Sequence, residues 1–308
     1  MAYEHNSGFF AGFNARLDQL PRTQFFFGGR KVPAFRGLAV FGYYLAVLLG
    51  LLTALLSGLS LLAALGLAAV CALSFFAWAY VRRALSGHEE LVLLEHLWFA
   101  LLCCTLFGVA AELSLPNYLD LISAPVALFL AAGRLGCLTV GCCHGVPASV
   151  GIVYPEDIPL AQESSRWRIG IRLLPVPALE AAALMAIALG ALLLLILGPP
   201  GSALAWFLCS YAVVRFGIEG LRGDKRPHLF GLSQARWMSL VQLLAALVWA
   251  QSALAAVDTP RTALISIGVL ALSAVIATIF ARPESVYTQE QTKELGEAMH
   301  AMPSLSTD

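Results

Sequence analysis

Long apolar runs alternate along the chain with short segments rich in polar residues, glycine or proline. Most runs approach the length of about twenty residues at which an α-helix crosses the hydrocarbon of a bilayer. The pattern predicts eight such helices, over residues 38–57, 60–81, 91–112, 119–136, 177–198, 203–221, 237–256 and 263–281. We therefore expect an all-α fold, a polytopic integral membrane helical bundle of seven to eight transmembrane helices.

The composition agrees with a membrane protein. Hydrophobic residues make up 59% of the 308 residues, and Asp, Glu, Lys and Arg only 12%, against about 25% in an ordinary soluble domain. The mean hydropathy is +0.79. A soluble core of this size would need many more polar residues to cover its surface, so a secreted domain and a nucleic-acid-binding domain are both excluded.

The polar segments divide the chain into three regions. Residues 1–36 combine basic residues with clusters of phenylalanine, a composition typical of a segment lying at the membrane interface; a disordered tail is the alternative. Residues 37–281 form the transmembrane domain, with a loop at 137–176 expected to cap one face. The polar residues 282–308 are expected to be a disordered C-terminal tail.

The positive charges are unevenly distributed over the two faces. With eight spans, the N-terminal segment and the long loops at 137–176 and 222–236 lie on the same face. That face holds all but two of the 19 basic residues, since Arg261 lies on the other face and Arg215 within a span. The positive-inside rule therefore predicts that the loop-rich face is cytoplasmic.

Four charged residues interrupt or end the apolar runs. Arg134 stands at the end of the fourth predicted span, and Arg215 and Glu219 stand in the sixth at a spacing that puts them on one helix face, which Arg222 continues. A charge at membrane depth costs several kcal/mol unless it is paired or hydrated, and so indicates a functional site. Because a guanidinium can bind two phosphate oxygens at once, the arginines suggest a lipid phosphate.

Small residues surround the first of these arginines. Gly133 and Gly136 flank Arg134, and glycine lets a backbone or a ligand approach closely. The alternative is purely structural, with a buried arginine–glutamate bridge or arginines that extend from helix ends to the lipid headgroups.

Three of the seven cysteines form a cluster in sequence with a histidine: Cys137, Cys142, Cys143 and His144. We expect these small residues to pack in a tight turn, with metal or redox chemistry as the alternative. A structural zinc site usually needs a second, distant pair of ligands, and haem attachment needs C-x-x-C-H; the sequence has neither. We expect no metal site and no cofactor.

The third predicted span opens with SGHEELVLLEHLWFALL, in which His96 is either a base or an interfacial residue. Its neighbour Glu95 is expected to be an interfacial charge.

The segment at 133–145 reads GRLGCLTVGCCHG, and LLPVPALEA, YAVVRFGIEGLRGDKRP and GLSQARWMSLVQLL follow it. In the same order, these segments are similar to G-R-x-G-N-F-x-N-G-E-x-x-G, H-P-x-Q-L-Y-E, R-F-x-x-E-x-x-R and S-x-x-Q-x-x-S, the motifs of the bacterial prolipoprotein diacylglyceryl transferases. The resemblance extends from about residue 118 to 245, with a weaker similarity in the first predicted span.

The resemblance implies an activity and a location. A diacylglyceryl group passes from phosphatidylglycerol to the lipobox cysteine of a lipoprotein precursor, which becomes a thioether as glycerol phosphate leaves. The two substrates and membrane lipid are the implied partners, no nucleic acid is involved, and no cofactor is needed. The implied location is the bacterial inner (plasma) membrane, as a multi-pass protein. The family's catalytic face is periplasmic, opposite to the charge-based prediction.

The resemblance also implies site residues. Arg134 and Arg215 match the family's essential arginines, which would neutralise the departing phosphate, and His96 falls loosely on the histidine of an H-G-G-L segment, the base for the acceptor thiol. The implied catalytic residues are Arg134, Arg215, Glu219 and His96, and the implied substrate-binding residues are Gly133, Gly136, Cys137, Gly145 and Arg222.

Several polar positions of the family's pattern differ in this chain. Leu97 and Trp98 replace the glycines of H-G-G-L, Cys137 and Val140 replace the motif asparagines, and Cys142 replaces its glutamate. These differences leave two alternatives open: a lipid-modifying transferase with another acceptor, and a non-catalytic phospholipid-binding or transport membrane protein.

Overall fold

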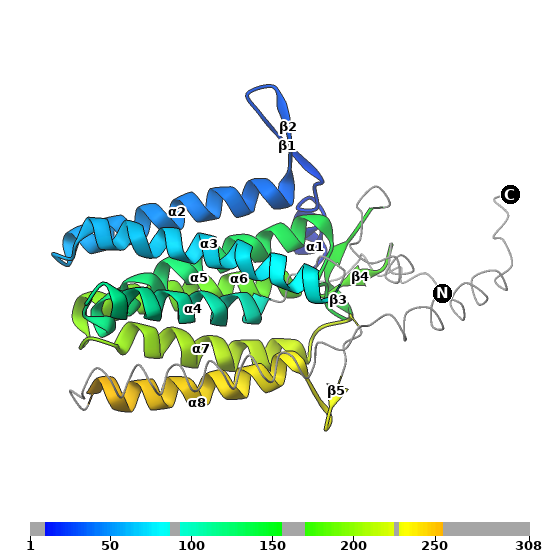
Figure 1. Ribbon diagram of the computed structural model, residues 1–308. Coiled ribbons are helices and arrows are strands. Elements are labelled where there is room, and N and C mark those ends of the chain that lie inside the picture. The colour runs from blue at the N-terminus through cyan, green and yellow to red at the C-terminus, as the bar shows by residue number, and fades with distance from the viewer. Residues whose placement is uncertain (1–9, 87–92, 156–169, 225–227, 255–308) are drawn as a thin grey trace, which may run out of the picture.

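The computed structural model describes residues 10–86, 93–155, 170–224 and 228–254. Long helices lie side by side along the molecule (Figure 1). They are α2 (Ala34–Leu56), α3 (Leu61–Ser86), α4 (Leu93–Ala110), α5 (Leu115–Val140), α6 (Val176–Leu197), α7 (Ser202–Glu219) and α8 (Gln234–Leu254). Each lies within a few residues of one of the first seven predicted spans. The span predicted at 263–281 and the tail at 282–308 lie outside the described residues.

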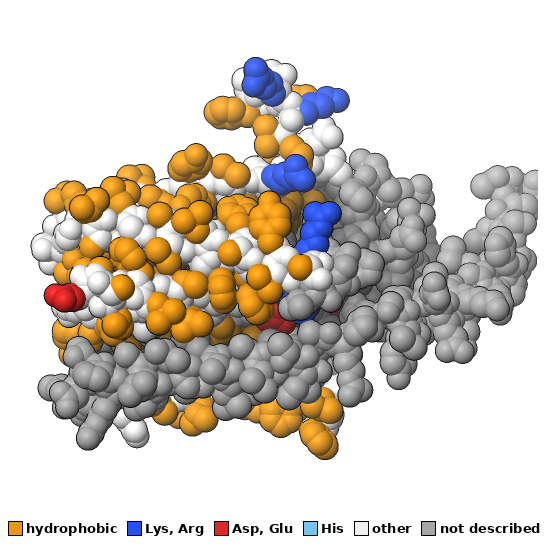
Figure 2. Space-filling view, in the orientation of Figure 1, with side chains coloured by type: hydrophobic (Ala, Val, Ile, Leu, Met, Phe, Trp, Pro, Cys, Tyr) orange, Lys and Arg blue, Asp and Glu red, His pale blue; other side chains and the backbone are white. Residues whose placement is uncertain are grey.

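Apolar side chains cover the flank of the bundle. Five of the described helices, α2, α3, α5, α6 and α7, are long and apolar enough to cross a membrane. Among the described residues, α4 has a shorter apolar stretch, and α8 begins with the polar sequence QARWMS. Figure 2 shows the apolar side chains spread along the bundle, whereas the basic side chains gather at one end. Leu62 and Leu73, for example, are 80% and 70% exposed, as expected of residues that face lipid. The protein is an all-α, polytopic membrane protein.

Short elements gather at the end where α5 and α7 finish (Figure 1). They are α1 (Ala11–Leu17) and the strands β1 (Gln24–Phe27), β2 (Arg30–Pro33), β3 (Pro147–Val153), β4 (Arg172–Leu173), β5 (His228–Leu229) and β6 (Leu232–Ser233), which pair as three antiparallel ladders. The helical periodicity did not predict these strands, because each is only two to seven residues long. The described parts of the N-terminal segment and of the two long loops therefore share one end of the bundle, as the sequence predicts.

The N-terminal segment is tied to the predicted capping loop. The side chain of Asn14, on α1, donates to the carbonyl of Ser149 at 2.9 Å and accepts from the amide of Gly151 at 3.1 Å. Asp18 forms a two-point ion pair with Arg172 of β4, with N–O distances of 3.0 Å. The described parts of 1–36 and 137–176 therefore cover the same end of the bundle, while a position of residues 1–36 at the membrane interface remains a prediction.

Helix α5 is the centre of the bundle. It contacts α2, α3, α4, α6 and α7, and it is the most buried of the five candidate spans. Gly42 of α2 lies so close to α5 that a Cβ there would collide with the side chain of Ala132. Small residues at such a crossing allow two helix backbones to approach closely, which is how helices in lipid gain packing contacts. Because α5 is held on several sides, the residues at its end have fixed positions.

A buried carboxylate fixes the start of α7 against α5. Asp120 of α5 is 3% exposed and accepts hydrogen bonds from the amides of Gly201 and Leu204, at 2.6 and 2.8 Å. These amides belong to the first turn of α7, where backbone N–H groups have no partner within the helix. The carboxylate therefore acts as an N-cap supplied by a neighbouring helix, and it also matches the positive end of the helix dipole.

We predict that Asp120→Ala lowers the free energy of unfolding in detergent by about 2 kcal/mol, because two buried amides lose their acceptor. Thermal unfolding of the purified protein measures the effect. Asn117→Ala, which removes a polar contact to Ser114 at the surface of the same helix, is the matched control and should change little. Equal losses for the two variants would contradict the capping role.

Candidate functional site

The predicted site residues come from three helices that meet at one end of the bundle. Helices α5 and α7 finish at this end and α6 begins there, because consecutive helices are antiparallel. Arg134 lies six residues before the end of α5, about 9 Å along the helix axis, and Arg215 lies one turn before the end of α7. Glu180 is in the second turn of α6. All three side chains are buried, so a cluster of charges lies just inside the bundle.

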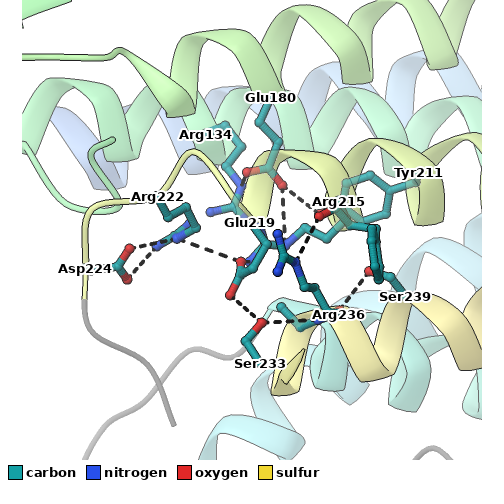
Figure 3. A network of polar contacts seen from close by, with 12 residues as sticks. Arg134, Glu180, Tyr211, Arg215, Glu219, Arg222, Asp224, Ser233, Arg236 and Ser239 are labelled. Atoms are coloured by element: carbon teal, nitrogen blue, oxygen red, sulfur yellow. Dashed lines mark hydrogen bonds and ion pairs between the residues drawn. The ribbon is translucent and has the colours of Figure 1, made fainter. Parts of the chain in front are cut away.

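One carboxylate holds two guanidinium groups together (Figure 3). The Nε of Arg134 lies 2.9 Å from one oxygen of Glu180, and the Nε of Arg215 lies 3.9 Å from the other. The hydroxyl of Tyr211 donates to Glu180 Oε1 at 3.0 Å. The two arginines that lie 81 positions apart in sequence therefore contact the two oxygens of a single carboxylate, a separation that one phosphate group can also span.

A second carboxylate extends the network toward the loops. Glu219 pairs with Arg215 at 2.8 Å, lies 4.0 Å from the Nε of Arg222, and accepts a hydrogen bond from the hydroxyl of Ser233 at 2.9 Å. Asp224 accepts from Nε and Nη2 of Arg222 at 2.8 and 2.9 Å. Figure 3 shows the residues of this network converging from α5, α6 and α7, from the segment after α7, and from the start of α8.

The guanidinium donors are only partly used. Arg134, Arg215 and Arg222 are 7%, 3% and 8% exposed, and each offers five N–H donors. The Nη1 atoms of Arg215 and Arg222 are buried and have no hydrogen-bond partner among the described residues. A buried donor without a partner costs free energy, and a ligand with several acceptor oxygens would satisfy both. The ion pairs with Glu180 and Glu219 are also what a purely structural arginine–glutamate bridge would show. The unpartnered Nη1 donors favour a bound anion instead.

The three predicted glycines have different surroundings. A Cβ on Gly145 would lie 2.7 Å from the carbonyl oxygen of Leu174, and Gly145 forms a β-bridge with Arg222, so its small size brings three backbone segments together. A Cβ on Gly136 would lie 3.0 Å from the ring of Phe35, at the start of α2. Outside its own stretch of helix, no atom of the described residues lies within 4 Å of the corresponding position on Gly133. Gly145 and Gly136 thus have packing reasons for their size.

His96 and Glu95 are neighbouring buried residues on α4. The His96 ring packs on Phe75 of α3, with 4.7 Å between the ring centroids. The prediction that Glu95 is an interfacial charge is wrong: it is 3% exposed and lies 3.2 Å from Arg82. It accepts from Gln234 at 2.8 Å, and Gln234 directly follows the serine that bonds to Glu219. Buried donors thus compensate the carboxylate for its lost hydration.

The cysteine cluster is compact in space. The Sγ atoms of Cys137, Cys142 and Cys143 lie within 4.8 Å of one another. The expected tight turn is present, with Gly141 and Cys143 both in the left-handed region at φ 75° and 59°. Hydrogen bonding with the other two thiols holds the pKa of Cys143 well below its usual range, and the charges of nearby Arg222 and Arg134 act in the same direction.

Sequence reasoning alone did not single out several members of the network: Glu180, Tyr211, Ser233 and Asp224. One signal was available, because Glu180 is the single acidic residue of LLPVPALEA and stands where the family pattern H-P-x-Q-L-Y-E has its glutamate. Tyr211, Asp224 and Ser233 also lie in segments that resemble the family's motifs, but none of them is a charge inside an apolar run.

Fold and site together define a polytopic membrane protein with a buried arginine–carboxylate site at one end of its bundle. A family model for prolipoprotein diacylglyceryl transferase matches residues 96–251. This match covers about half of the chain, and the chain belongs to that family. A protein of Clostridium perfringens (strain 13 / Type A), named phosphatidylglycerol–prolipoprotein diacylglyceryl transferase 2, is 32% identical over 131 residues, which are 41% of this chain and 47% of the relative. The chain thus spans about half the length of the curated relative that it matches.

We predict that Glu180→Ala strongly destabilises the protein, by about 3–5 kcal/mol, because it leaves two buried guanidiniums without their shared carboxylate. Asp18→Ala removes a half-exposed ion pair with Arg172 and should cost about 1 kcal/mol or less. Thermal unfolding in detergent compares the two variants. Similar losses would show that Glu180 does not hold the arginine pair together.

Proposed function

We propose that the protein transfers a diacylglyceryl group from phosphatidylglycerol to the thiol of a lipoprotein-precursor cysteine. The observation that carries the proposal is the convergence of Arg134 and Arg215 on one carboxylate, together with the buried Nη1 donors of Arg215 and Arg222 that have no hydrogen-bond partner among the described residues. Membership of the family and the printed name of the Clostridium relative support it.

The proposed reaction is a displacement at the glycerol carbon that carries the phosphate ester. The acceptor sulfur forms a bond to that carbon, the carbon–oxygen bond breaks, and glycerol phosphate leaves with the electron pair. Negative charge develops on the leaving oxygen, and preorganised guanidiniums stabilise such charge most effectively where water is excluded. Arg134 and Arg215 take this role, and the thiol proton passes to a base.

Glu219 and Arg222 are proposed to position the pair rather than react. Glu219 lies between Arg215 and Arg222 and is itself fixed by Ser233, so it holds the Arg215 guanidinium in one orientation. Arg222 supplies further donors at the edge of the site, where its backbone is bridged to Gly145 in the loop after α5. His96 is the proposed base, on the strength of the family pattern and of its burial beside Glu95.

We place the protein in the bacterial inner membrane, with the site end of the bundle facing the periplasm as in the family. The basic residues at that end favour the opposite orientation. However, Arg134, Arg215 and Arg222 belong to the site, and charges in long loops have less influence on orientation than those in short loops.

A related transferase with a different acceptor is the second candidate. The large side chains of Leu97 and Trp98 are 5% and 6% exposed and stand where the family pattern has glycines, while Cys137 and Cys142 replace polar motif residues. The arginines that would bind the donor lipid are all present. The changed residues are therefore not the arginines proposed to bind the phosphate, and a different acceptor could be accommodated without loss of the donor-lipid site.

The decisive assay combines purified protein, phosphatidylglycerol and a lipobox peptide, with mass spectrometry of the peptide. We predict a diacylglyceryl adduct whose rate of formation falls by about 10²–10³ in Arg134→Ala. Arg215→Lys should also lose most activity, because an ammonium cannot reproduce a two-point contact to phosphate.

Arg30→Ala is the matched control, since Arg30 is exposed in the β1–β2 hairpin, and it should retain full activity. A wild-type protein that forms no adduct yet binds the lipid through Arg134 would favour another acceptor or a non-catalytic role. Full activity in Arg134→Ala would refute the proposed site.

A further inference from the structure

The three clustered thiols form no bond in the proposed reaction, in which the resemblance implies only a substrate-binding role for Cys137, and they have a geometry of their own. Cys137 is in the last turn of α5, and the turn at 141–143 reverses the chain so that Cys142 and Cys143 return to it. The Cys142 thiol points back to the carbonyl of Cys137, at 3.8 Å. Two residues in the left-handed region make this reversal, and one of them is a cysteine, a residue that rarely adopts that conformation.

We propose that Cys137, Cys142 and Cys143 form a three-thiolate binding site for a thiophilic divalent cation such as zinc. Zinc binds thiolate sulfur at about 2.3 Å, which places the sulfurs of a tetrahedral site about 3.8 Å apart. The three Sγ atoms already lie within 4.8 Å of one another, so small side-chain rotations suffice. Three protein ligands with one open position is an arrangement that zinc commonly adopts.

The charges around the cluster favour the complex. Three thiolates and one divalent cation carry a net charge of minus one. Arg134 lies about one turn before Cys137 on α5, and Arg222 forms a backbone bridge with Gly145, two residues after Cys143. These guanidiniums oppose a bare cation but stabilise the anionic complex. The three cysteines are half-buried rather than sealed, so a cation can reach them from the loop end of the bundle.

The other cysteines provide internal controls. Cys71 and Cys104 form a second close pair between α3 and α4, with 3.2 Å between their sulfurs. Cys209 lies on α7. Within the part of the chain that the structure describes, neither of these places brings three possible ligand atoms together as the proposed site requires.

The test uses the full-length protein, purified in detergent with a phosphine reductant. Its metal content is measured first, and the metal-free protein, prepared with a chelator, is then titrated with Zn²⁺ and with Cd²⁺. We expect one equivalent of bound metal and a thiolate-to-cadmium absorption band that saturates at one equivalent. Cys137→Ser, Cys142→Ser and Cys143→Ser should each weaken binding more than about 100-fold, whereas Cys209→Ser and the double variant Cys71→Ser/Cys104→Ser should bind as the wild type does.

If a serine variant fails to fold, the titration of the metal-free wild type still tests the proposal, because it needs no variant. Absence of a saturable cadmium band in the reduced wild type would overturn the proposal. So would retention of wild-type affinity in all three cluster variants, or loss of binding in the Cys71/Cys104 double variant alone. A disulfide between two of the three cysteines in the purified protein, found by mass spectrometry, with no metal bound after reduction, would assign the cluster to redox chemistry instead. These outcomes do not depend on whether the protein transfers lipid.

Discussion

The interaction on which the site depends is the shared contact of Arg134 and Arg215 with the carboxylate of Glu180. Guanidiniums buried at the end of a membrane helix repel each other and lose their hydration, so they stay together only where an anion lies between them. Glu180 provides one oxygen to each arginine, and Glu219 adds a second negative charge on the far side of Arg215. The network thus keeps the two cations at a distance that suits one phosphate, before any ligand binds.

The bundle is built so that this contact forms. Helix α5 is packed by neighbours along most of its length and carries Arg134 near its end, while Asp120 holds the beginning of α7 against α5 at the opposite end. With both ends of α7 fixed, Arg215 has a defined position relative to Arg134. The backbone bridge between Gly145 and Arg222 then closes the loop after α5 over the loop after α7, so the same constraint also positions the three thiols.

The long helices could be predicted from sequence because a bilayer demands about twenty apolar residues per span. Seven helices of the described residues lie where the pattern placed them, and five of these are long and apolar enough to cross a membrane. Arg134, Arg215 and Glu219 were equally visible, since a charge inside an apolar run is rare. Glu95 was misjudged because it stands at the start of a run, where exposure to the interface and burial against another helix look the same. The short strands were missed because they have no periodicity long enough to detect.

The site features that the sequence did not predict depend on how the helices pack in three dimensions. Glu180 and Tyr211 acquire their roles only from the packing of α6 and α7 on α5, which no local spacing encodes. The cysteines looked like the contents of a tight turn, and the turn exists, but the convergence of all three sulfurs depends on the backbone conformations at Gly141 and Cys143. Where the family motif has an asparagine and a glutamate, this chain has Cys137 and Cys142, and only the structure shows that their sulfurs meet that of Cys143.

The claim that Arg134 and Arg215 hold a lipid phosphate is tested most directly by an experimental structure of the protein with phosphatidylglycerol bound. The account predicts the phosphate between the two guanidiniums, with oxygens within about 3 Å of each, and with the buried Nη1 of Arg215 among the donors. A phosphate bound elsewhere, with both arginines still engaged only by Glu180 and Glu219, would contradict it and leave the network a purely structural one.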